Sequence, residues 1–238
     1  DKIKKFLKII ATLLAILLVT YLVSAVMSLA VIDPDNSNAG LYILLITQLL
    51  IAISTYIIIK IKKKQYGASY IRNKGFLSDS WKMIIIGFGA AGFGNMIIGL
   101  LMSLLEDNIL VNHSIDIVNA AFDANDILST IIQTILVVII APITEEVLFR
   151  GFVFNETNKI FSLKQAIIIN GVLFGLYHMN LLQGINTFFL AMVLSIVYYY
   201  RRNITDVIII HMVNNFFALT AGFDESYTIV LTIVSVIC

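Results

Sequence analysis

The sequence predicts an all-α, polytopic membrane protein with about eight transmembrane helices in one bundle. Three observations carry this prediction. Of the 238 residues, 59% are hydrophobic and 13% are charged, whereas about a quarter of the residues of a soluble domain are charged. The mean hydropathy is +0.94. Apolar stretches near the roughly 20 residues that a bilayer-spanning helix needs recur along the chain.

The expected helices follow one another with short loops between them. The apolar stretches cover residues 6–32, 40–61, 82–105, 127–150, 163–180, 184–200, 204–222 and 226–238. The first stretch is far longer than the roughly 7–15 apolar residues of a signal peptide, so it predicts a membrane helix. The last stretch is short for a complete span.

Charge is segregated between the two sides that this helix count defines. All sixteen Lys and Arg lie within residues 1–5, 62–82, 150–164 and 201–206 or at most three residues from them, and the opposite loops hold nine carboxylates and no basic residue. Positive charge marks the cytoplasmic side of a membrane protein, so we expect both termini in the cytoplasm. Basic residues placed beside membrane spans do not indicate a nucleic-acid partner.

Small residues recur in the third expected helix, in GFGAAGFGNMIIG (87–99). The pattern superficially resembles a dinucleotide fingerprint, but no strand precedes it and no acidic residue follows at the required distance. Small side chains allow membrane helices to approach closely. The stretch therefore predicts close packing against a neighbouring helix.

Strongly polar residues stand out in the apolar segments, beginning with PITEEVLFRG at residues 142–151. A charged side chain at the centre of a membrane helix costs about 2.5–3.5 kcal/mol on insertion scales, and such residues usually mark function. The polar residues at membrane depth are Glu145, Glu146, Arg150, His178, His211, Asn214 and Asn215, with Asn170 and Gln133 as lesser cases. A single amide is most simply an interhelical hydrogen-bonding group, but two carboxylates, two histidines and an arginine together favour a functional site.

The spacing around the turn between the fourth and fifth helices predicts that Glu145 and His178 face each other. In FSLKQ, Ser162 and Gln165 have the spacing of a capping box that opens the fifth helix. Glu145 lies seventeen residues before Ser162, and His178 lies sixteen residues after it. If the fourth helix continues to about Lys159, both side chains lie about 20–25 Å along antiparallel helices and at matching depth.

Two further helical spacings add to the predicted site. His211 and Asn215 are four residues apart and share one face of the seventh helix, where their donors would suit an oxyanion hole. Glu146 and Arg150 have the same spacing and are predicted to form an ion pair. Glu145 rather than Glu146 is therefore assigned to the chemistry.

Two neighbouring residues are expected to shape this site. Pro142 removes a backbone hydrogen bond, so it is predicted to kink or break the fourth helix and to open a water-accessible cavity. Phe174 precedes His178 by one helical turn and projects to the same side. It is expected to be a core aromatic residue that holds the histidine in place.

Three motifs on three expected helices resemble those of the CPBP family. EEVLFRG (145–151), FGLYH (174–178) and HMVNN (211–215) are similar to the family's E-E-x-x-x-R, F-x-x-x-H and H-x-x-x-N motifs. The family includes CAAX prenyl endopeptidases of Ras-converting type and bacteriocin-processing or Abi proteins, and the resemblance covers roughly residues 80–222. It implies an intramembrane glutamate-dependent endopeptidase. The catalytic residues that it implies are Glu145, His178, His211 and Asn215, supported by Glu146, Arg150 and Phe174.

This resemblance sets the expected organisation, location and partners. We expect one integral membrane domain (1–238), in which residues 1–80 form two peripheral helices and a cytoplasmic loop, 81–222 a catalytic helical core and 223–238 a last short helix. The Ile-, Lys- and Asn-rich composition favours a bacterial plasma membrane. The expected substrate is a membrane-associated peptide or protein in the bilayer, either a leader on a bacteriocin or quorum-sensing peptide or a prenylated C-a-a-X tail.

Three alternatives remain open from the sequence. Two histidines and a glutamate could bind zinc, although H-E-x-x-H is absent and Asn is a poor ligand, so no cofactor is expected. A non-catalytic scaffold that regulates a partner membrane protein is a second alternative, but the complete motifs argue against it. A proton-coupled transporter is a third, and the clustering of the polar residues at one depth argues against a transport path.

Overall fold

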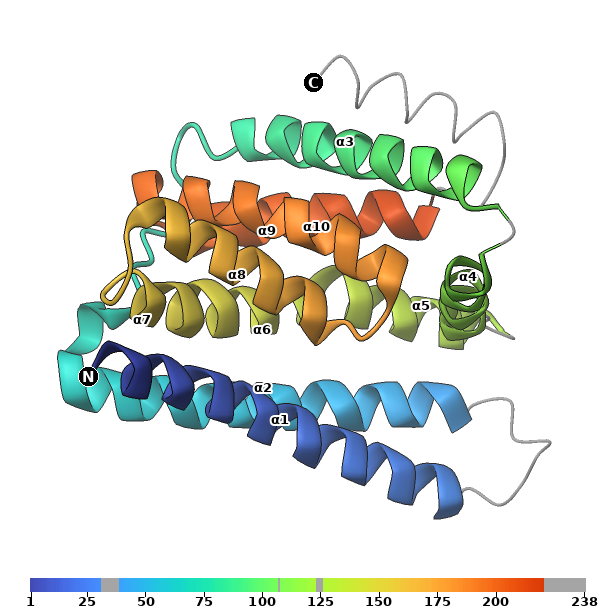
Figure 1. The fold of residues 1–238 in the computed structure, drawn as a ribbon, viewed down its shortest axis with the longest axis horizontal. Coiled ribbons are helices and arrows are strands. Elements are labelled where there is room, and N and C mark those ends of the chain that lie inside the picture. Colours follow the sequence, from blue (N-terminus) through green and yellow to red (C-terminus); the bar gives the residue numbers. More distant parts are fainter. Residues whose placement is uncertain (31–38, 107, 123–125, 221–238) are drawn as a thin grey trace. The chain divides into compact units, whose positions relative to one another are not determined.

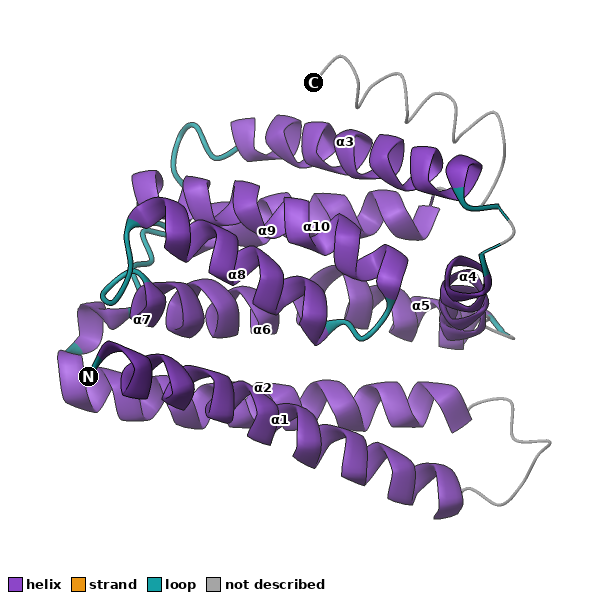
Figure 2. Ribbon diagram, viewed as in Figure 1, coloured by secondary structure: helices purple, strands orange, loops and turns teal. Residues whose placement is uncertain are grey.

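The computed structural model describes residues 1–30, 39–106, 108–122 and 126–220, and all regular structure in these residues is helical (Figures 1 and 2). This confirms the all-α prediction. The elements are α1 (Lys2–Ala30), α2 (Ala39–Tyr66), η1 (Ala68–Tyr70), α3 (Lys82–Leu104), α4 (Ile109–Phe122), α5 (Ile127–Ile135), η2 (Leu136–Ile140), α6 (Ala141–Leu148), η3 (Phe149–Phe154), α7 (Asn155–Thr157), α8 (Leu163–Tyr177), α9 (Leu181–Arg201) and α10 (Ile204–Thr220).

Five helices in the described residues are long and apolar enough to cross a membrane. They are Lys2–Leu29, Gly40–Tyr66, Lys82–Leu104, Ile127–Thr157 and Leu181–Arg201. Two shorter apolar helices, α8 and α10, have 15 and 17 residues. These helices define an integral membrane protein, as predicted. The expected helix at 226–238 lies outside the described residues.

Hydropathy alone does not reveal one of the helices. Residues 106–126 were predicted to form an external loop, but 109–122 form α4. Its 14 residues are too few for a span, and polar residues interrupt its apolar ones, so hydropathy does not distinguish it from a loop.

The chain divides into two compact units. The first comprises residues 1–71 and 123–161, and the second comprises 72–122 and 162–238. In the first unit α1 and α2 run antiparallel (Figure 1) and are joined by a hydrogen bond between the hydroxyls of Ser24 and Thr47 at 3.0 Å. The helix that carries the first motif packs against α2.

Glycines allow close helix packing in the second unit. A Cβ at Gly87 of α3 would lie 2.7 Å from Cβ of Val213 of α10, and a Cβ at Gly94 would collide with the side chain of Asn186 of α9. This confirms the predicted packing role at both positions. A Cβ at Gly99 would have no neighbour within 4 Å among the described residues, so close packing at that position stays a prediction.

In the described residues, a similarly close approach between backbones joins α8 to α9. A Cβ at Gly175 would lie 2.6 Å from the carbonyl oxygen of Gly184, and the reciprocal distance is 2.9 Å. Both obstacles are backbone atoms, which cannot rotate away as a side chain can. The two helices can therefore meet at this depth because both positions are glycine.

Replacing Gly175 by Ala is expected to lower the stability of the second unit by about 1–3 kcal/mol, because the added methyl must push α9 away. Thermal unfolding in detergent measures this loss. Gly99→Ala is the matched control, since it adds the same methyl where no described residue lies within 4 Å. Equal stability of the two variants would contradict the packing role of Gly175.

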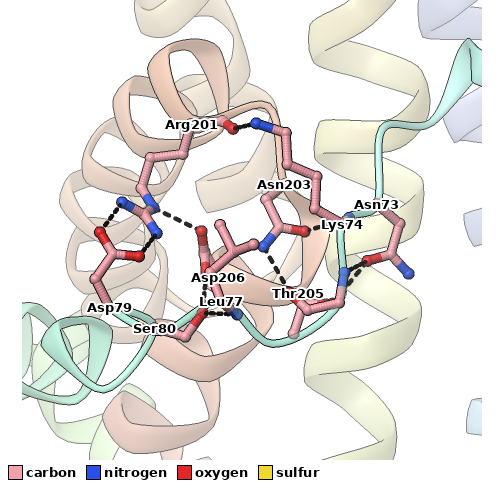
Figure 3. A network of polar contacts seen from close by, with 10 residues as sticks. Asn73, Lys74, Leu77, Asp79, Ser80, Arg201, Asn203, Thr205 and Asp206 are labelled. Carbon is pink, nitrogen blue, oxygen red and sulfur yellow. Dashed lines mark hydrogen bonds and ion pairs between the residues drawn. The ribbon is translucent and has the colours of Figure 1, made fainter.

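A polar network ties the loop before α3 to the turn between α9 and α10 (Figure 3). Arg201 donates two hydrogen bonds to the carboxylate of Asp79, at 2.8 and 2.9 Å, and a third to Asp206 at 2.6 Å. Ser80 donates to the other oxygen of Asp206 at 2.7 Å. Asp206 lies in the first turn of α10, so this network sets where the helix of the third motif begins.

Asp79 makes the stability of this network depend on pH. The hydrogen bonds from Arg201 lower the pKa of Asp79 below its ordinary value of 3.8. A carboxylate with a lowered pKa stabilises the folded state above its unfolded-state pKa, and that stabilisation is lost as the pH falls through the folded value. We therefore expect wild-type thermal stability to fall more steeply between about pH 5 and pH 3 than that of Asp79→Asn. Asp116→Asn on α4 serves as a control, and a curve for Asp79→Asn parallel to the wild type would contradict the assignment.

Candidate active site

The first motif lies on a continuous helix, Ile127–Thr157, that contains two π-helical segments. Asp126 caps the start of this helix by accepting a hydrogen bond from the backbone N–H of Ser129 at 3.0 Å. The segments η2 and η3 lie directly before and after α6, which carries both glutamates. Such π turns inside α-helices are frequent at functional sites.

Of the two outcomes predicted for Pro142, a break of the helix is wrong, because the helix is continuous from Ile127 to Thr157, whereas a kink and a water-accessible cavity stay predictions. Pro142 lies in the first turn of α6, directly after η2, where Ala141 N–H bonds to the carbonyl of Leu136, five residues back. The wider π turn accommodates a residue that has no N–H and whose ring crowds the preceding turn. The helix continues to Thr157, which confirms the predicted continuation past Arg150.

Glu145, Glu146 and Arg150 are buried in the first unit. These three residues are 7%, 0% and 0% exposed, respectively. The Nη1 of Arg150 donates to Oε1 of Glu146 at 2.8 Å, which confirms the predicted ion pair. A buried ion must be paired because removing one partner leaves an uncompensated charge, so each member of this pair makes the other's burial tolerable.

A second polar cluster fixes the far end of the same helix. The carboxylate of Glu156 accepts hydrogen bonds from Lys62 of α2 at 2.8 Å and from Tyr70 of η1 at 2.9 Å. Lys159 donates to it at 2.7 Å. Asn155 donates to the backbone carbonyl of Tyr70 at 3.0 Å. These contacts hold the helix of the first motif against the end of α2, which limits its rotation about its own axis.

The second motif ends α8, and His178 is its C-cap. The predicted capping box at the start of α8 is confirmed, with Ser162 and Gln165 bonded reciprocally. The Nδ1 of His178 lies 2.8 Å from the carbonyl oxygen of Phe174. Because a carbonyl oxygen only accepts, this bond places a proton on Nδ1. In neutral His178, Nε2 is then the basic nitrogen.

The turn after His178 ends a helix that is too short to cross a bilayer on its own. A helix of 15 residues is about 22 Å long, which is shorter than the roughly 30 Å hydrocarbon core. Asn180 satisfies the polar groups of this turn, since it accepts from the backbone N–H of Gln183 at 3.0 Å and donates to the carbonyl of Ser114 in α4 at 2.9 Å. Backbone groups that lie in hydrocarbon must be satisfied internally in this way.

The third motif lies on α10 and meets the second through one aromatic ring. The centroid of Phe174 is 4.8 Å from that of His178 and 5.7 Å from that of His211, edge-to-face in both cases. Phe174 and His211 are almost fully buried. Phe174 therefore packs against both imidazoles, which is more than the support of His178 that the sequence predicted.

Asn214 contacts the amide of the third motif. It is buried and donates from Nδ2 to Oδ1 of Asn215 at 3.3 Å. This bond holds the oxygen of the Asn215 carboxamide toward Asn214. The NH₂ group of Asn215 therefore points away from Asn214. The sequence marked Asn214 as a polar residue but assigned it no partner.

The structure brings the predicted residues together in two groups. Glu145, Glu146 and Arg150 belong to the first unit, and the residues of the other two motifs belong to the second. The pairing of Glu145 with His178 joins the two units and stays a prediction. Of the lesser polar residues, Asn170 accepts a hydrogen bond from Ser195 of α9 at 3.1 Å, as expected of an interhelical hydrogen-bonding group.

The fold and these residues define a class: a polytopic helical membrane protein with glutamate, histidine and asparagine side chains on separate helices. Residues 127–217 match the family model for Rce1-like type II CAAX prenyl endopeptidases. The matched residues include all three motifs, so this part of the chain is similar to that protease family. The match agrees with the resemblance of the three motifs. No curated protein and no solved structure matches the chain.

Proposed function

We propose that this protein is an intramembrane endopeptidase that hydrolyses a peptide bond in a membrane-associated peptide or protein. The contact of the Phe174 ring with both His178 and His211 carries the proposal, because it joins the residues assigned to water activation and to the oxyanion hole. The match of residues 127–217 to a protease family supports the same class of reaction.

In this mechanism Glu145, assisted by Nε2 of His178, takes a proton from water. The resulting hydroxide forms a bond to the scissile carbonyl carbon, and the carbonyl π electrons move to oxygen. His211 and Asn215 donate hydrogen bonds to that oxyanion, and each such donor is worth about 10²–10³-fold in rate. When the tetrahedral intermediate collapses, the C–N bond breaks and the proton held by the base passes to the leaving amine.

The supporting residues have distinct tasks in this scheme. In the ion pair between Nη1 of Arg150 and Oε1 of Glu146, at 2.8 Å, each charge compensates the other. The pairing keeps Glu146 out of the proton transfer. Asn214 orients the Asn215 carboxamide. The substrate that we favour is a leader on a bacterial secreted or quorum-sensing peptide, with a prenylated C-a-a-X tail as the other candidate.

The direct test incubates detergent-purified protein with membrane-anchored peptides of both kinds and identifies the products by mass spectrometry. We expect a single internal cleavage that is lost in His178→Ala and retained in His113→Ala, whose histidine lies exposed on α4. If every candidate remains intact with folded wild-type protein, or if His178→Ala cleaves at the wild-type rate, the proposed mechanism is wrong.

A chelator tests the expectation that the reaction needs no metal. The neutral imidazole with a basic Nε2 is also the form that binds zinc, so the tautomer does not separate the two mechanisms. In the described residues no group of three or more His, Cys, Asp or Glu is arranged to hold a metal. We expect the cleavage rate to change less than about twofold after dialysis against a strong chelator. A loss of activity that added Zn²⁺ restores would support a zinc mechanism.

A further inference from the structure

Seven exposed lysines gather at one end of the α1–α2 hairpin. Starting from the Ser24–Thr47 hydrogen bond, sixteen residues back along α1 reach Lys8, and sixteen residues onward along α2 reach Lys63. Because both helices rise equally per residue, the start of α1 is level with the end of α2, and Figure 1 shows these two ends side by side. The lysine patch consists of Lys2, Lys4, Lys5, Lys8, Lys60, Lys63 and Lys64.

The positive charge of this patch is almost uncompensated. Neither α1 nor α2 contains an acidic residue. In the described part of the chain, the one ion pair that any patch lysine makes is Lys5–Asp1 at 2.9 Å, and both of its side chains are largely exposed. An exposed pair at this spacing contributes little, so the patch attracts anions.

The structure separates the patch from the structural lysines beside it. Lys62, in the same run as Lys63 and Lys64, turns inward and binds Glu156 at 2.8 Å. Lys159 binds the same carboxylate and lies 3.8 Å above the ring of Tyr66. These two lysines hold the first unit together. The patch lysines take no part in that cluster, so neutralising them removes charge from the surface without removing its internal ion pairs.

Apolar side chains beside the patch identify the kind of anion. Ile3 is 74% exposed, Leu7 57% and Ile61 59%, and each is next to a patch lysine in sequence. Long apolar helices whose outward side chains are exposed face lipid tails, and lysines at their ends extend to the headgroup level. A partner that contacts both the lysines and the apolar side chains must carry an anionic group next to a hydrocarbon region.

We infer that the lysine patch binds anionic phospholipid headgroups and anchors the first unit at the membrane surface. Each lysine near an anionic surface strengthens binding by a factor of about five. Neutralising three patch lysines should therefore weaken the binding of anionic lipid by about a hundredfold. This inference does not depend on the proposed peptidase activity.

The test follows the thermal unfolding of the full chain in a neutral detergent during titration with phosphatidylglycerol or with phosphatidylcholine of the same acyl chains. A ligand that binds the folded state raises the unfolding temperature as its occupancy increases. We expect phosphatidylglycerol to stabilise the wild type and phosphatidylcholine to have little effect. The triple variant Lys60→Gln/Lys63→Gln/Lys64→Gln should need about a hundredfold more phosphatidylglycerol for the same shift.

Two matched variants make the result specific. Arg72→Gln/Lys82→Gln/Lys164→Gln removes three exposed charges from the second unit and should change the lipid response less than about threefold. Lys62→Gln should lower the unfolding temperature without lipid but keep the phosphatidylglycerol shift. Equal responses to both lipids, or equal losses in the two triple variants, would overturn the inference. Equal stabilisation by inorganic phosphate, or by an acidic peptide without lipid, would reassign the patch to a soluble anion or to a protein partner and would overturn it too.

Discussion

Replacing Glu145 by Gln is expected to lower the rate of peptide cleavage by about 10²–10⁴-fold, the usual contribution of a general base. Glutamine has nearly the same size, so the packing around this buried residue is kept, but its amide cannot take a proton from water. Initial rates on one identified peptide, followed by mass spectrometry, measure the loss. The unfolding temperature of the variant should stay close to that of the wild type.

Glu145→Asp is the informative companion of this variant. It keeps the carboxylate but withdraws it by one methylene group, and misplacement of about 1 Å can cost about 10²-fold in rate. We therefore expect partial activity, above that of Glu145→Gln. Wild-type cleavage by a folded Glu145→Gln variant would show that this carboxylate is not the base. Retained biological activity without any cleavage would favour the scaffold alternative.

Replacing Arg150 by Met is expected to destabilise the first unit by about 3–5 kcal/mol, because it leaves the carboxylate of Glu146 buried without its arginine. Both side chains are fully buried, and Nη1 of Arg150 lies 2.8 Å from Oε1 of Glu146. Glu146→Gln should lower the stability by a similar amount, because it leaves the positive charge of Arg150 buried without its carboxylate. The double variant should be more stable than the sum of the two losses implies, because it buries no uncompensated charge.

An ion pair of the same spacing provides the control for this double-mutant cycle. Lys5 and Asp1 are also four residues apart, but their side chains are 62% and 79% exposed. Lys5→Met should change the stability by at most about 1 kcal/mol. Unfolding in detergent, followed by circular dichroism, measures the variants of both pairs. Additive losses in the Glu146–Arg150 cycle would show that the two residues do not act as a pair.

Local spacing predicted much of this protein correctly. The all-α class and the long spans follow from hydropathy alone. The Glu146–Arg150 pair and the Ser162–Gln165 capping box each join residues within four positions on one helix. Helical geometry places such residues together whatever the rest of the chain does, which is why these contacts could be read from the sequence.

Local spacing does not predict how the helix accommodates Pro142. The residue predicts a disturbance of the hydrogen-bond pattern, but the form of that disturbance depends on what the neighbouring turns can adopt. In this chain η2 forms a wider, π-helical turn, and the helix goes on to Thr157. The short helix α4 was missed for a related reason, since it lacks the length by which a span is recognised.

The sequence by itself determined the membrane class, the helical motifs and the contacts within single helices, because these depend on composition and on a fixed helical period. The tertiary structure alone decided which helices meet. It placed Phe174 against two histidines, Gly175 against Gly184, and Arg201 against Asp79, which lies 122 positions away in the chain. Such partners are selected by the packing of whole helices, where the shape and hydrogen bonding of many side chains act together, and no single spacing encodes them.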